Sequence, residues 1–316
     1  MKAPVDFSKK KFLVTGAGGF LGAHIVDALV KRGVPQDWIV APRSSECDLR
    51  IKENCEAIVK GVDCVIHAAG VTGNLEFHKQ HPATIFHDNL AMGFNLMDAA
   101  YRAGVQKFIT IGSATEYPEH TPLPLNEDDL WNGAMEKIHE PYSIAKKVLL
   151  CQAEAYHKEY GFHSFQVLMT NMYGPGEKTD GGPIPSLIKR IADAKNANAE
   201  TLTVWGTGKQ TRDFLYVGDA AEGIVSALAR YEKADPVNLG SGHETSIEDL
   251  AKLIAKLMRF EGSIVFDTTK PDGQARRVMD ISRAKREFGF KPTTSLEEGL
   301  IKTIAFHVPL STIVIP

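Results

Sequence analysis

The chain has 316 residues, of which 43% are hydrophobic and 24% are charged, and its formal net charge is −3. This length allows one large domain or two lobes that share an interface. Basic residues cluster only at Lys9–Lys11, so neither a nucleic acid nor a membrane is expected as a partner. The chain has no signal-peptide core and no run of about 18 apolar residues. Its four cysteines lack zinc or disulfide spacing, which favours a reducing, cytoplasmic location and no metal site.

The first half of the chain alternates short β-rich runs with longer helical patterns. We expect strands at residues 11–15, 38–41, 63–67, 107–111 and 163–169, and helices at 20–32, 82–103 and 141–160. The strands are nearly continuous apolar runs, which is typical of a parallel sheet covered by helices on both faces. The predicted fold class is therefore α/β, a Rossmann-type doubly wound parallel sheet with a smaller C-terminal substrate lobe.

The alternation of strands and helices becomes less regular after about Tyr173, where Gly and Pro cluster at residues 174–176 and 181–183. One later segment, about 213–242, is expected to return to the main sheet. We therefore expect residues 1–172 together with about 213–242 to form the Rossmann domain. Residues 173–212 and 243–316 are expected to form the substrate lobe.

A glycine-rich loop follows the first expected strand and opens a helix: Gly16-Ala-Gly-Gly19-Phe-Leu-Gly22. Such glycines allow a tight turn and a close approach of the backbone to a pyrophosphate, which the helix N-terminus then attracts. A glycine-rich loop by itself also suits a flexible turn. Its place directly after the first strand of a strand–helix–strand pattern favours a dinucleotide site.

The second expected strand ends at Ala41-Pro-Arg43-Ser-Ser45, where NAD-preferring sites usually carry Asp or Glu. An arginine there suits a 2′-phosphate, although a solvated loop arginine is the simpler alternative. We therefore expect NADP(H), with NAD(H) as the alternative. The expected cofactor-binding residues are Gly16, Gly19, Phe20, Leu21, Gly22, Arg43, Asp48, Leu49, Ala68, Ala69 and Lys146.

The most specific signal is Tyr142-Ser-Ile-Ala-Lys146, with Ser113 at the end of the preceding strand. Tyr and Lys four residues apart lie on one helical face. A lysine ammonium is expected to lower the pKa of the phenol, so that Tyr142 passes a proton near neutral pH. Ser113 is placed to hydrogen-bond the same substrate oxygen.

The glycine loop, Ser113-Ala-Thr-Glu-Tyr-Pro118 and Tyr142-x-x-x-Lys146 resemble the extended short-chain dehydrogenase/reductases that act on nucleotide sugars. Among these, the chain is most similar to the GDP-L-fucose synthases, over nearly its whole length. The matching segments include residues 126–130, 140–146, 170–175, 204–208, 212–217, 270–273 and 295–300.

The resemblance implies roles for particular residues. Ser113, Tyr142 and Lys146 match the catalytic triad. The expected substrate-binding residues are Asn171, Arg190, Trp205, Arg212 and Lys270. The family also implies a homodimer, in which the helices at 82–103 and 141–160 of two subunits form a four-helix bundle.

One departure from the family pattern concerns epimerisation. GDP-L-fucose synthases carry a Cys two residues after the Ser, and a His in the substrate-lobe loop, as acid and base at C3 and C5. Here the Cys position is Thr115, our fourth candidate catalytic residue, and the His position is Gly182.

The leading hypothesis is an NADPH-dependent reductase of a nucleotide-linked 4-keto sugar, expected to be a GDP-4-keto-6-deoxy sugar, without the epimerisation pair. The alternative is a nucleotide-sugar C4-epimerase with tightly bound NAD, because Ser113-Ala-Thr115 also resembles the strand-end motif of those epimerases. A non-catalytic dinucleotide-binding protein is disfavoured, since it would not need Ser113, Tyr142 and Lys146 together.

Overall fold

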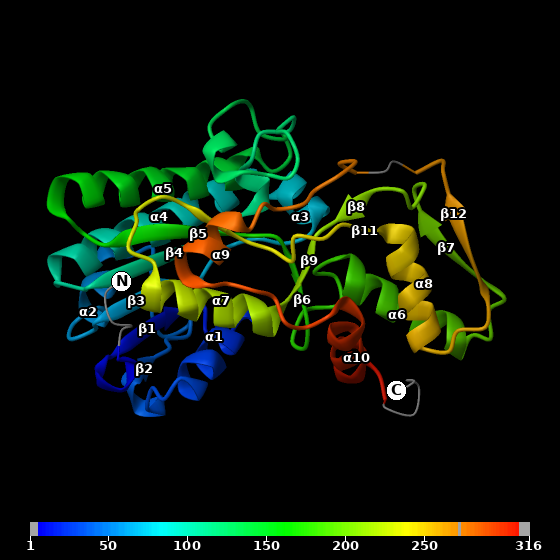
Figure 1. The fold of residues 1–316 in the computed structure, drawn as a ribbon, viewed down its shortest axis with the longest axis horizontal. Helices are drawn as coiled ribbons and strands as arrows, with labels where there is room; N and C mark the ends of the chain where they lie inside the picture. Colours follow the sequence, from blue (N-terminus) through cyan, green and yellow to red (C-terminus); the bar gives the residue numbers. More distant parts are fainter. Residues whose placement is uncertain (1–5, 271–272, 310–316) are drawn as a thin grey trace.

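The computed structural model describes residues 6–270 and 273–309. Two residues of the expected 270–273 motif, Pro271 and Asp272, lie outside this range. Two parts of the molecule lie side by side, a larger one around a central sheet and a smaller one that contains α6 (Pro183–Asn196), β7 (Thr201–Trp205), α8 (Ile247–Leu257) and β12 (Ser263–Asp267) (Figure 1).

The central sheet has six strands in the order β10-β5-β4-β3-β1-β2, and every neighbouring pair is parallel. Its strands are β1 (Phe12–Thr15), β2 (Ile39–Val40), β3 (Cys64–His67), β4 (Lys107–Ser113), β5 (Ser164–Met169) and β10 (Val237–Leu239). The chain winds outward from β1 in two directions, first to β2 and then through β3 to β10. Ligands of such sheets bind beyond the carboxyl ends of the strands at this change of direction.

Helices cover both faces of the sheet, as the apolar strands predicted (Figure 1). The core of one face is formed with α1 (Phe20–Lys31), α7 (Val217–Arg230) and α9 (Ser282–Phe288). The core of the other face is formed with α2 (Lys52–Ile58), α4 (Pro82–Arg102) and α5 (Glu140–Tyr160). A short helix, α3 (Leu75–Gln80), precedes α4. The predicted α/β, doubly wound parallel fold is confirmed.

The smaller part has a separate hydrophobic core between α6 (Pro183–Asn196), α8 (Ile247–Leu257), α10 (Leu296–His307) and a parallel pair of strands. The pair consists of β7 (Thr201–Trp205) and β12 (Ser263–Asp267). Two further pairs are β6 (Asn171–Tyr173) with β9 (Phe214–Tyr216), and β8 (Thr211–Arg212) with β11 (Thr245–Ser246). The domain boundaries expected from the sequence remain a prediction.

Short 3-10 helices lie in the segments that connect these elements: η1 (Phe7–Lys9), η2 (Gln36–Trp38), η3 (Ala114–Glu116) and η4 (Glu127–Asp129). The strand expected at 38–41 is reduced to Ile39–Val40, because Trp38 closes the η2 turn instead of extending the strand. None of the helices in the described ranges is long and apolar enough to cross a lipid bilayer.

Candidate active site

The glycine loop joins β1 to α1. Gly16 has a φ of 71°, and a Cβ on it would lie 2.7 Å from the backbone nitrogen of Ala69. A Cβ on Gly22 would lie 2.1 Å from the Gly16 carbonyl oxygen. A side chain at either position would therefore clash with backbone, which only glycine avoids. The turn thus brings β1, the start of α1 and the segment after β3 together.

The N-terminus of α1 has the features of an anion site. Its N-cap, Gly19, makes no side-chain capping bond. The first N–H groups of a helix lack intrahelical partners, and the helix dipole favours negative charge there. Phe20 and Leu21 form the first turn of this helix, and Ala68 lies beside Gly16. The expected pyrophosphate-binding residues therefore surround one helix end, and their role remains a prediction.

Arg43 lies after β2 with an exposed side chain. Its backbone N–H donates to the Glu46 carboxylate at 3.1 Å. The sequence reasoning found no acid at the strand tip and overlooked Glu46, three residues further on. A carboxylate beside Arg43 would oppose a 2′-phosphate, so the choice between NADP(H) and NAD(H) depends on how the two side chains arrange.

A second arginine of this segment is already paired with carboxylates. Arg50 donates from Nη2 to Asp48 at 2.7 Å and from Nη1 to Asp88 at 3.0 Å. Hydrogen bonds from Arg50 hold the pKa of Asp48 at about 2. Leu49 is buried in the core beneath α2 and α4. The expected cofactor residue Asp48 is thus tied to Arg50 rather than directed by itself toward a ribose.

Ser113 and Thr115 lie where β4 passes into the η3 turn. The backbone N–H and the hydroxyl of Thr115 both donate to Ser113 Oγ, at 3.2 and 3.0 Å. On α5, the Ser143 hydroxyl donates to the Thr115 carbonyl at 2.7 Å. These bonds fix the strand end against the start of the helix that carries Tyr142.

Tyr142 and Lys146 are one turn apart on α5. Lys146 is 3% exposed, and its Nζ lies 5.7 Å from the centroid of the Tyr142 ring. The helix therefore places both side chains on one face, as the spacing predicted. Their catalytic roles with Ser113 remain a prediction.

The ionisation of this pair differs from the expectation. Burial raises the pKa of the Tyr142 phenol, and the carboxyl of Glu116 raises it further. Burial also lowers the pKa of the Lys146 ammonium, which Glu116 partly opposes. The expectation that Lys146 lowers the pKa of the phenol is wrong here, because loss of water disfavours the charged form of each group. Tyr142 therefore holds its proton at neutral pH, which is the state that a proton donor needs.

A histidine pair, His78 and His139, packs on Tyr142 through the ring of His78. The His78 ring packs on the Tyr142 ring with centroids 5.7 Å apart, and on the His139 ring at 4.8 Å. His78 is 4% exposed, and its Nε2 lies 3.1 Å from Thr72 Oγ1. Burial and the nearby His139 lower the pKa of His78. From the sequence, His78 is expected on a surface helix or loop, which its burial contradicts, and His139 was missed, since no motif connects residues so far apart in the chain.

Glu136 interacts with His139 and with two half-buried arginines, Arg212 and Arg277. Its Oε2 lies 3.0 Å from His139 Nδ1. Burial lowers the pKa of Arg212, and burial together with Arg212 lowers that of Arg277 to about 10; Glu136 opposes both shifts. Two adjacent guanidinium groups with one carboxylate suit a diphosphate. Arg212 was predicted, whereas Arg277 was missed.

Both guanidinium groups are held by neutral oxygens. Arg212 Nη1 donates to the carbonyls of Thr211 and Gln274 at 2.7 and 2.6 Å. Arg277 Nε donates to Gln274 Oε1 at 2.9 Å. Neutral acceptors orient the two cations without cancelling their charge.

The other expected substrate-binding residues lie in or next to the smaller part of the molecule. Asn171 is in β6. Arg190 of α6 donates from Nη2 to the Thr203 carbonyl on β7, so its side chain is engaged with the backbone. Trp205, at the end of β7, is 65% exposed, and Lys270 Nζ lies 5.8 Å from its ring centroid. Their contacts with a nucleotide remain a prediction.

A carboxyl group borders Gly182, the N-cap of α6. A Cβ on Gly182 would lie 3.0 Å from Glu177 Oε1. Burial raises the pKa of Glu177 to about 8, and its Oε2 has no hydrogen-bond partner within residues 6–270 and 273–309. Sequence reasoning missed Glu177, which lies earlier in the same loop. A titratable group therefore occurs near the position where the resemblance expects a histidine.

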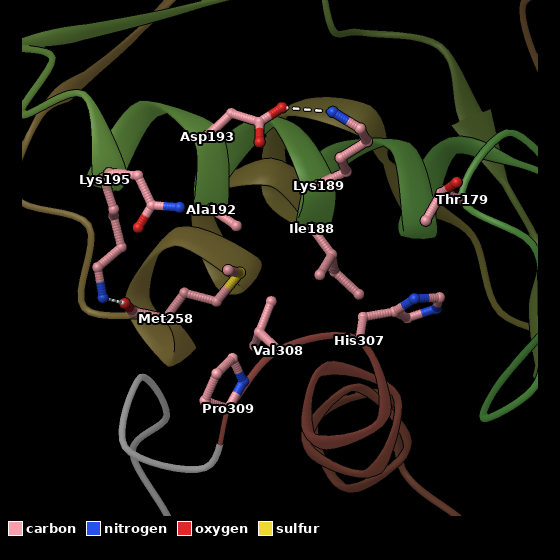
Figure 2. A pocket seen from close by; sticks show the side chains of 11 residues that line it. Thr179, Ile188, Lys189, Ala192, Asp193, Lys195, Met258, His307, Val308 and Pro309 are labelled. Carbon is pink, nitrogen blue, oxygen red and sulfur yellow. Dashed lines mark hydrogen bonds and ion pairs between the residues drawn. The ribbon is translucent and has the colours of Figure 1, made fainter.

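A cavity of about 360 Å³ lies between α6, the end of α8 and the residues that follow α10 (Figure 2). Lys189 and Asp193 form an ion pair along one edge, and Ile188 and Val308 give it an apolar wall. None of the predicted site residues lines this cavity. The candidate active site is therefore defined by its residues at the strand ends rather than by this cavity.

Comparison with known proteins decides the family. Residues 12–240 match the NAD dependent epimerase/dehydratase family. The chain belongs to this family. A GDP-L-fucose synthase from Sinorhizobium fredii is 36% identical over 299 residues, which cover 93% of this chain and 94% of that protein. A probable GDP-L-fucose synthase 1 from Oryza sativa is 34% identical over 304 residues, covering 94% and 92%.

Solved structures of this epimerase/dehydratase family agree with the fold. A GDP-L-fucose synthetase from Naegleria fowleri bound to NADP has a TM-score of 0.86 at 25% identity, covering 97% of this chain and 96% of that one. A GDP-mannoheptose C4 reductase from Campylobacter jejuni with NADP bound shares the fold, with a TM-score of 0.85 at 23% identity and coverage of 95% and 98%. The resemblance to extended short-chain dehydrogenase/reductases, and the enzyme class of an NAD(P)-dependent nucleotide-sugar oxidoreductase, are confirmed.

Proposed function

We propose that this enzyme is an NADPH-dependent reductase of a GDP-linked 4-keto-6-deoxy sugar that leaves C3 and C5 unchanged. The observation that carries the proposal is the grouping of Ser113, Tyr142 and Lys146 at one strand end, with Thr115 and Gly182 at the two epimerisation positions. The names of the relatives supply the GDP-sugar class.

The cofactor site fits a dinucleotide phosphate. The α1 N-terminus has no side-chain cap, and the glycines at 16 and 22 let the backbone of the turn close beneath it, as in sites that bind a pyrophosphate. Bound NADPH would supply the hydride that reduces C4. NADP in two solved structures of similar fold supports this choice over NAD.

Tyr142 is the proton donor in the proposed reaction. Its phenol keeps its proton because burial and Glu116 raise its pKa. As C4 is reduced, charge develops on the sugar oxygen, which accepts this proton. Ser113 Oγ donates to the same oxygen, and the Lys146 ammonium stabilises the phenolate left behind.

Loss of epimerisation follows from the two substituted positions. The Thr115 hydroxyl donates to Ser113 Oγ, and its alcohol is a far weaker acid than the thiol of a cysteine, whose pKa is about 8.5. Gly182 has no side chain. Neither residue can take a proton from a carbon next to the ketone.

The arginine pair supports a diphosphate-linked substrate. Arg212 and Arg277 present adjacent positive charges held by neutral oxygens. Fixed, partly desolvated guanidinium groups favour phosphate oxygens. Glu136 links this pair to His139, whose ring packs on His78 and through it on Tyr142, so the phosphates and the reacting sugar would bind along one continuous path.

The test is turnover of a GDP-4-keto-6-deoxy sugar with NADPH in deuterated water, followed by mass spectrometry of the product. We expect one equivalent of NADPH to be oxidised and no solvent deuterium at carbon beyond a no-enzyme control. Uptake at C3 or C5 would contradict the reductase-only proposal, and its loss in Glu177→Gln would identify Glu177 as the base. Turnover of a 4-hydroxy sugar without net oxidation of NADPH, on enzyme purified with bound NAD, would favour the C4-epimerase.

We also propose that the enzyme is a homodimer through α4 and α5. These two helices pack side by side, and Phe86 and Phe94 on α4 are 37% and 48% exposed. A hollow of about 340 Å³ lies between the starts of the two helices, lined by Phe86, Pro141 and Ile144 among others. A second copy would cover this apolar face. Phe94→Glu should give a monomer in analytical ultracentrifugation, and an unchanged dimer would exclude this surface.

A further inference from the structure

A row of polar side chains crosses the sheet beneath α5. Thr15, His67, Thr110 and Gln166 are register partners on β1, β3, β4 and β5, and each is at most 1% exposed. Register partners in a sheet lie on the same face. Gln166 Nε2 donates to the Lys146 backbone carbonyl at 3.1 Å, so the row faces the helix that carries the predicted catalytic pair.

Glu116 adds a carboxyl group to this row. It is 0% exposed, and its Oε1 accepts the Ser113 backbone N–H at 2.7 Å. A Cβ on Gly112 would lie 2.5 Å from Glu116 Oε1 and 2.8 Å from Gln166 Cδ. The side chains of Glu116 and Gln166 therefore meet above Gly112.

The two side chains lack a hydrogen-bond donor where they meet. Glu116 Oε2 and Gln166 Oε1 are buried without partners in the described part of the chain, as are Thr110 Oγ1 and His67 Nε2. The bond to Lys146 fixes the Gln166 amide, so its Oε1 is an acceptor only. An ionised carboxylate is also an acceptor only, and a buried polar group without a hydrogen-bond partner destabilises the fold. A proton on Glu116 Oε2 supplies the missing donor.

The charges around Glu116 agree with this protonation. Burial raises its pKa, while the Ser113 N–H, Lys146 and Lys147 oppose the shift. Burial lowers the pKa of His67, on the neighbouring strand β3, to about 3, so this imidazole is neutral. The other titratable groups affected by the Glu116 carboxyl are Tyr117, Tyr142, Lys146 and Lys147.

We propose that Glu116 is a positioning residue for Lys146, an inference that rests on the proposed reductase function. In the resting protein the Glu116 carboxyl carries a proton and donates it to Gln166 Oε1. As pH rises, Glu116 releases its proton to solvent before Lys146 does. The resulting carboxylate then holds the Lys146 ammonium in its charged form, so that the charge needed beside Tyr142 persists above neutral pH.

The test uses Glu116→Gln, which keeps the size of the side chain and an oxygen for the Ser113 N–H. Infrared spectra of the substrate-free protein should show the carbonyl stretch of a protonated carboxylic acid near neutral pH, which fades as pH rises. This band should be absent from Glu116→Gln. Glu177→Gln is the matched control, because burial raises the pKa of this carboxyl to about 8, so that it should contribute a separate band.

Kinetics provide the second measurement. In Glu116→Gln the basic limb of the pH profile of kcat should move to lower pH by about one unit, the effect of losing a nearby opposite charge. A structural role alone would lower kcat without moving this limb. Glu127→Gln, whose carboxylate accepts the Asn238 backbone N–H away from Lys146, should leave the limb in place.

Two results would overturn the proposal: acid bands in Glu116→Gln identical to those of the wild-type protein, or a basic limb that does not move. If Glu116→Gln fails to fold, Gln166→Met provides the alternative test. Loss of the Gln166 Oε1 acceptor should shift the acid band of Glu116 to higher frequency without removing it. The infrared result does not depend on the substrate. Failure of the wild-type protein to reduce a 4-keto sugar would therefore refute the proposed function separately.

Discussion

The rings of His78 and Tyr142 pack edge to face, with centroids 5.7 Å apart and planes at 82°. His78 comes from α3, which precedes α4, whereas Tyr142 begins α5. This contact buries the imidazole and so keeps it neutral, because the charged form would lose its water. The phenol is thus held in place by an uncharged ring.

Acid should destabilise the protein partly through His78. Its pKa is lower in the folded protein than the unfolded value of 6.5, so the unfolded chain binds more protons below that pH. The free energy of unfolding should therefore fall as pH drops below 6.5, by up to about 1.4 kcal/mol per pH unit for this group. His78→Asn removes this contribution, so urea denaturation at several pH values should give a flatter dependence. Parallel curves for the two proteins would contradict the prediction.

Tyr142→Phe should separate catalysis from folding. The variant keeps the ring contact with His78 and removes only the hydroxyl, so thermal stability and cofactor binding should persist. NADPH oxidation should slow by about 10² to 10⁴, the usual effect of losing a positioned general acid. Tyr231→Phe is the matched control: its hydroxyl donates to the Asp235 carbonyl, so stability should drop by about 1 kcal/mol with turnover retained. Near-normal turnover of Tyr142→Phe would exclude this residue as the donor.

Arg43→Ala tests whether Arg43 binds the 2′-phosphate of NADP(H). NADPH should bind about ten- to a hundredfold more weakly, the value of a charge-assisted hydrogen bond of about 1.5–3 kcal/mol, while NADH affinity changes little. Arg32→Ala, which removes an exposed arginine paired with Glu222, is the charge control. Titration by fluorescence gives the four affinities. Equal losses for both cofactors would show that Arg43 does not contact the phosphate.

Arg277→Met should weaken GDP binding without weakening the fold. The half-buried guanidinium of Arg277 lies near Arg212, and desolvation together with this like charge lowers its pKa, so the charged arginine destabilises the fold. We expect an equal or higher melting temperature without ligand, and a much smaller stabilisation by GDP. Arg276→Met removes the neighbouring exposed arginine, which pairs with Glu244, and should keep the full GDP effect. A variant of Arg277 that retains this effect would place the diphosphate elsewhere.

The sequence by itself determined the fold class, the glycine loop and the helical spacing of Tyr142 and Lys146. These features are local: apolar runs indicate buried parallel strands, and a four-residue interval fixes a helical face. Gly22 is equally local, since a Cβ there would meet Gly16 of the same turn, whereas Gly16 is required by the approach of Ala69 from the segment after β3. The pKa values of the site are not a local property. The predicted lowering of the Tyr142 pKa is wrong because burial depends on how the whole protein packs.

Only the tertiary structure decided which distant residues lie around Tyr142 and Lys146, the predicted catalytic pair, and around Arg212. His78 reaches Tyr142, Arg277 reaches Arg212, and Glu116 meets Gln166 through sheet register and helix packing rather than through any motif. Parallel strands bring together residues separated by whole helices, so neither spacing nor composition reveals these neighbours. Electrostatic effects in the interior act across such contacts, which is why the chemistry of the site depends on the fold more than on its motifs.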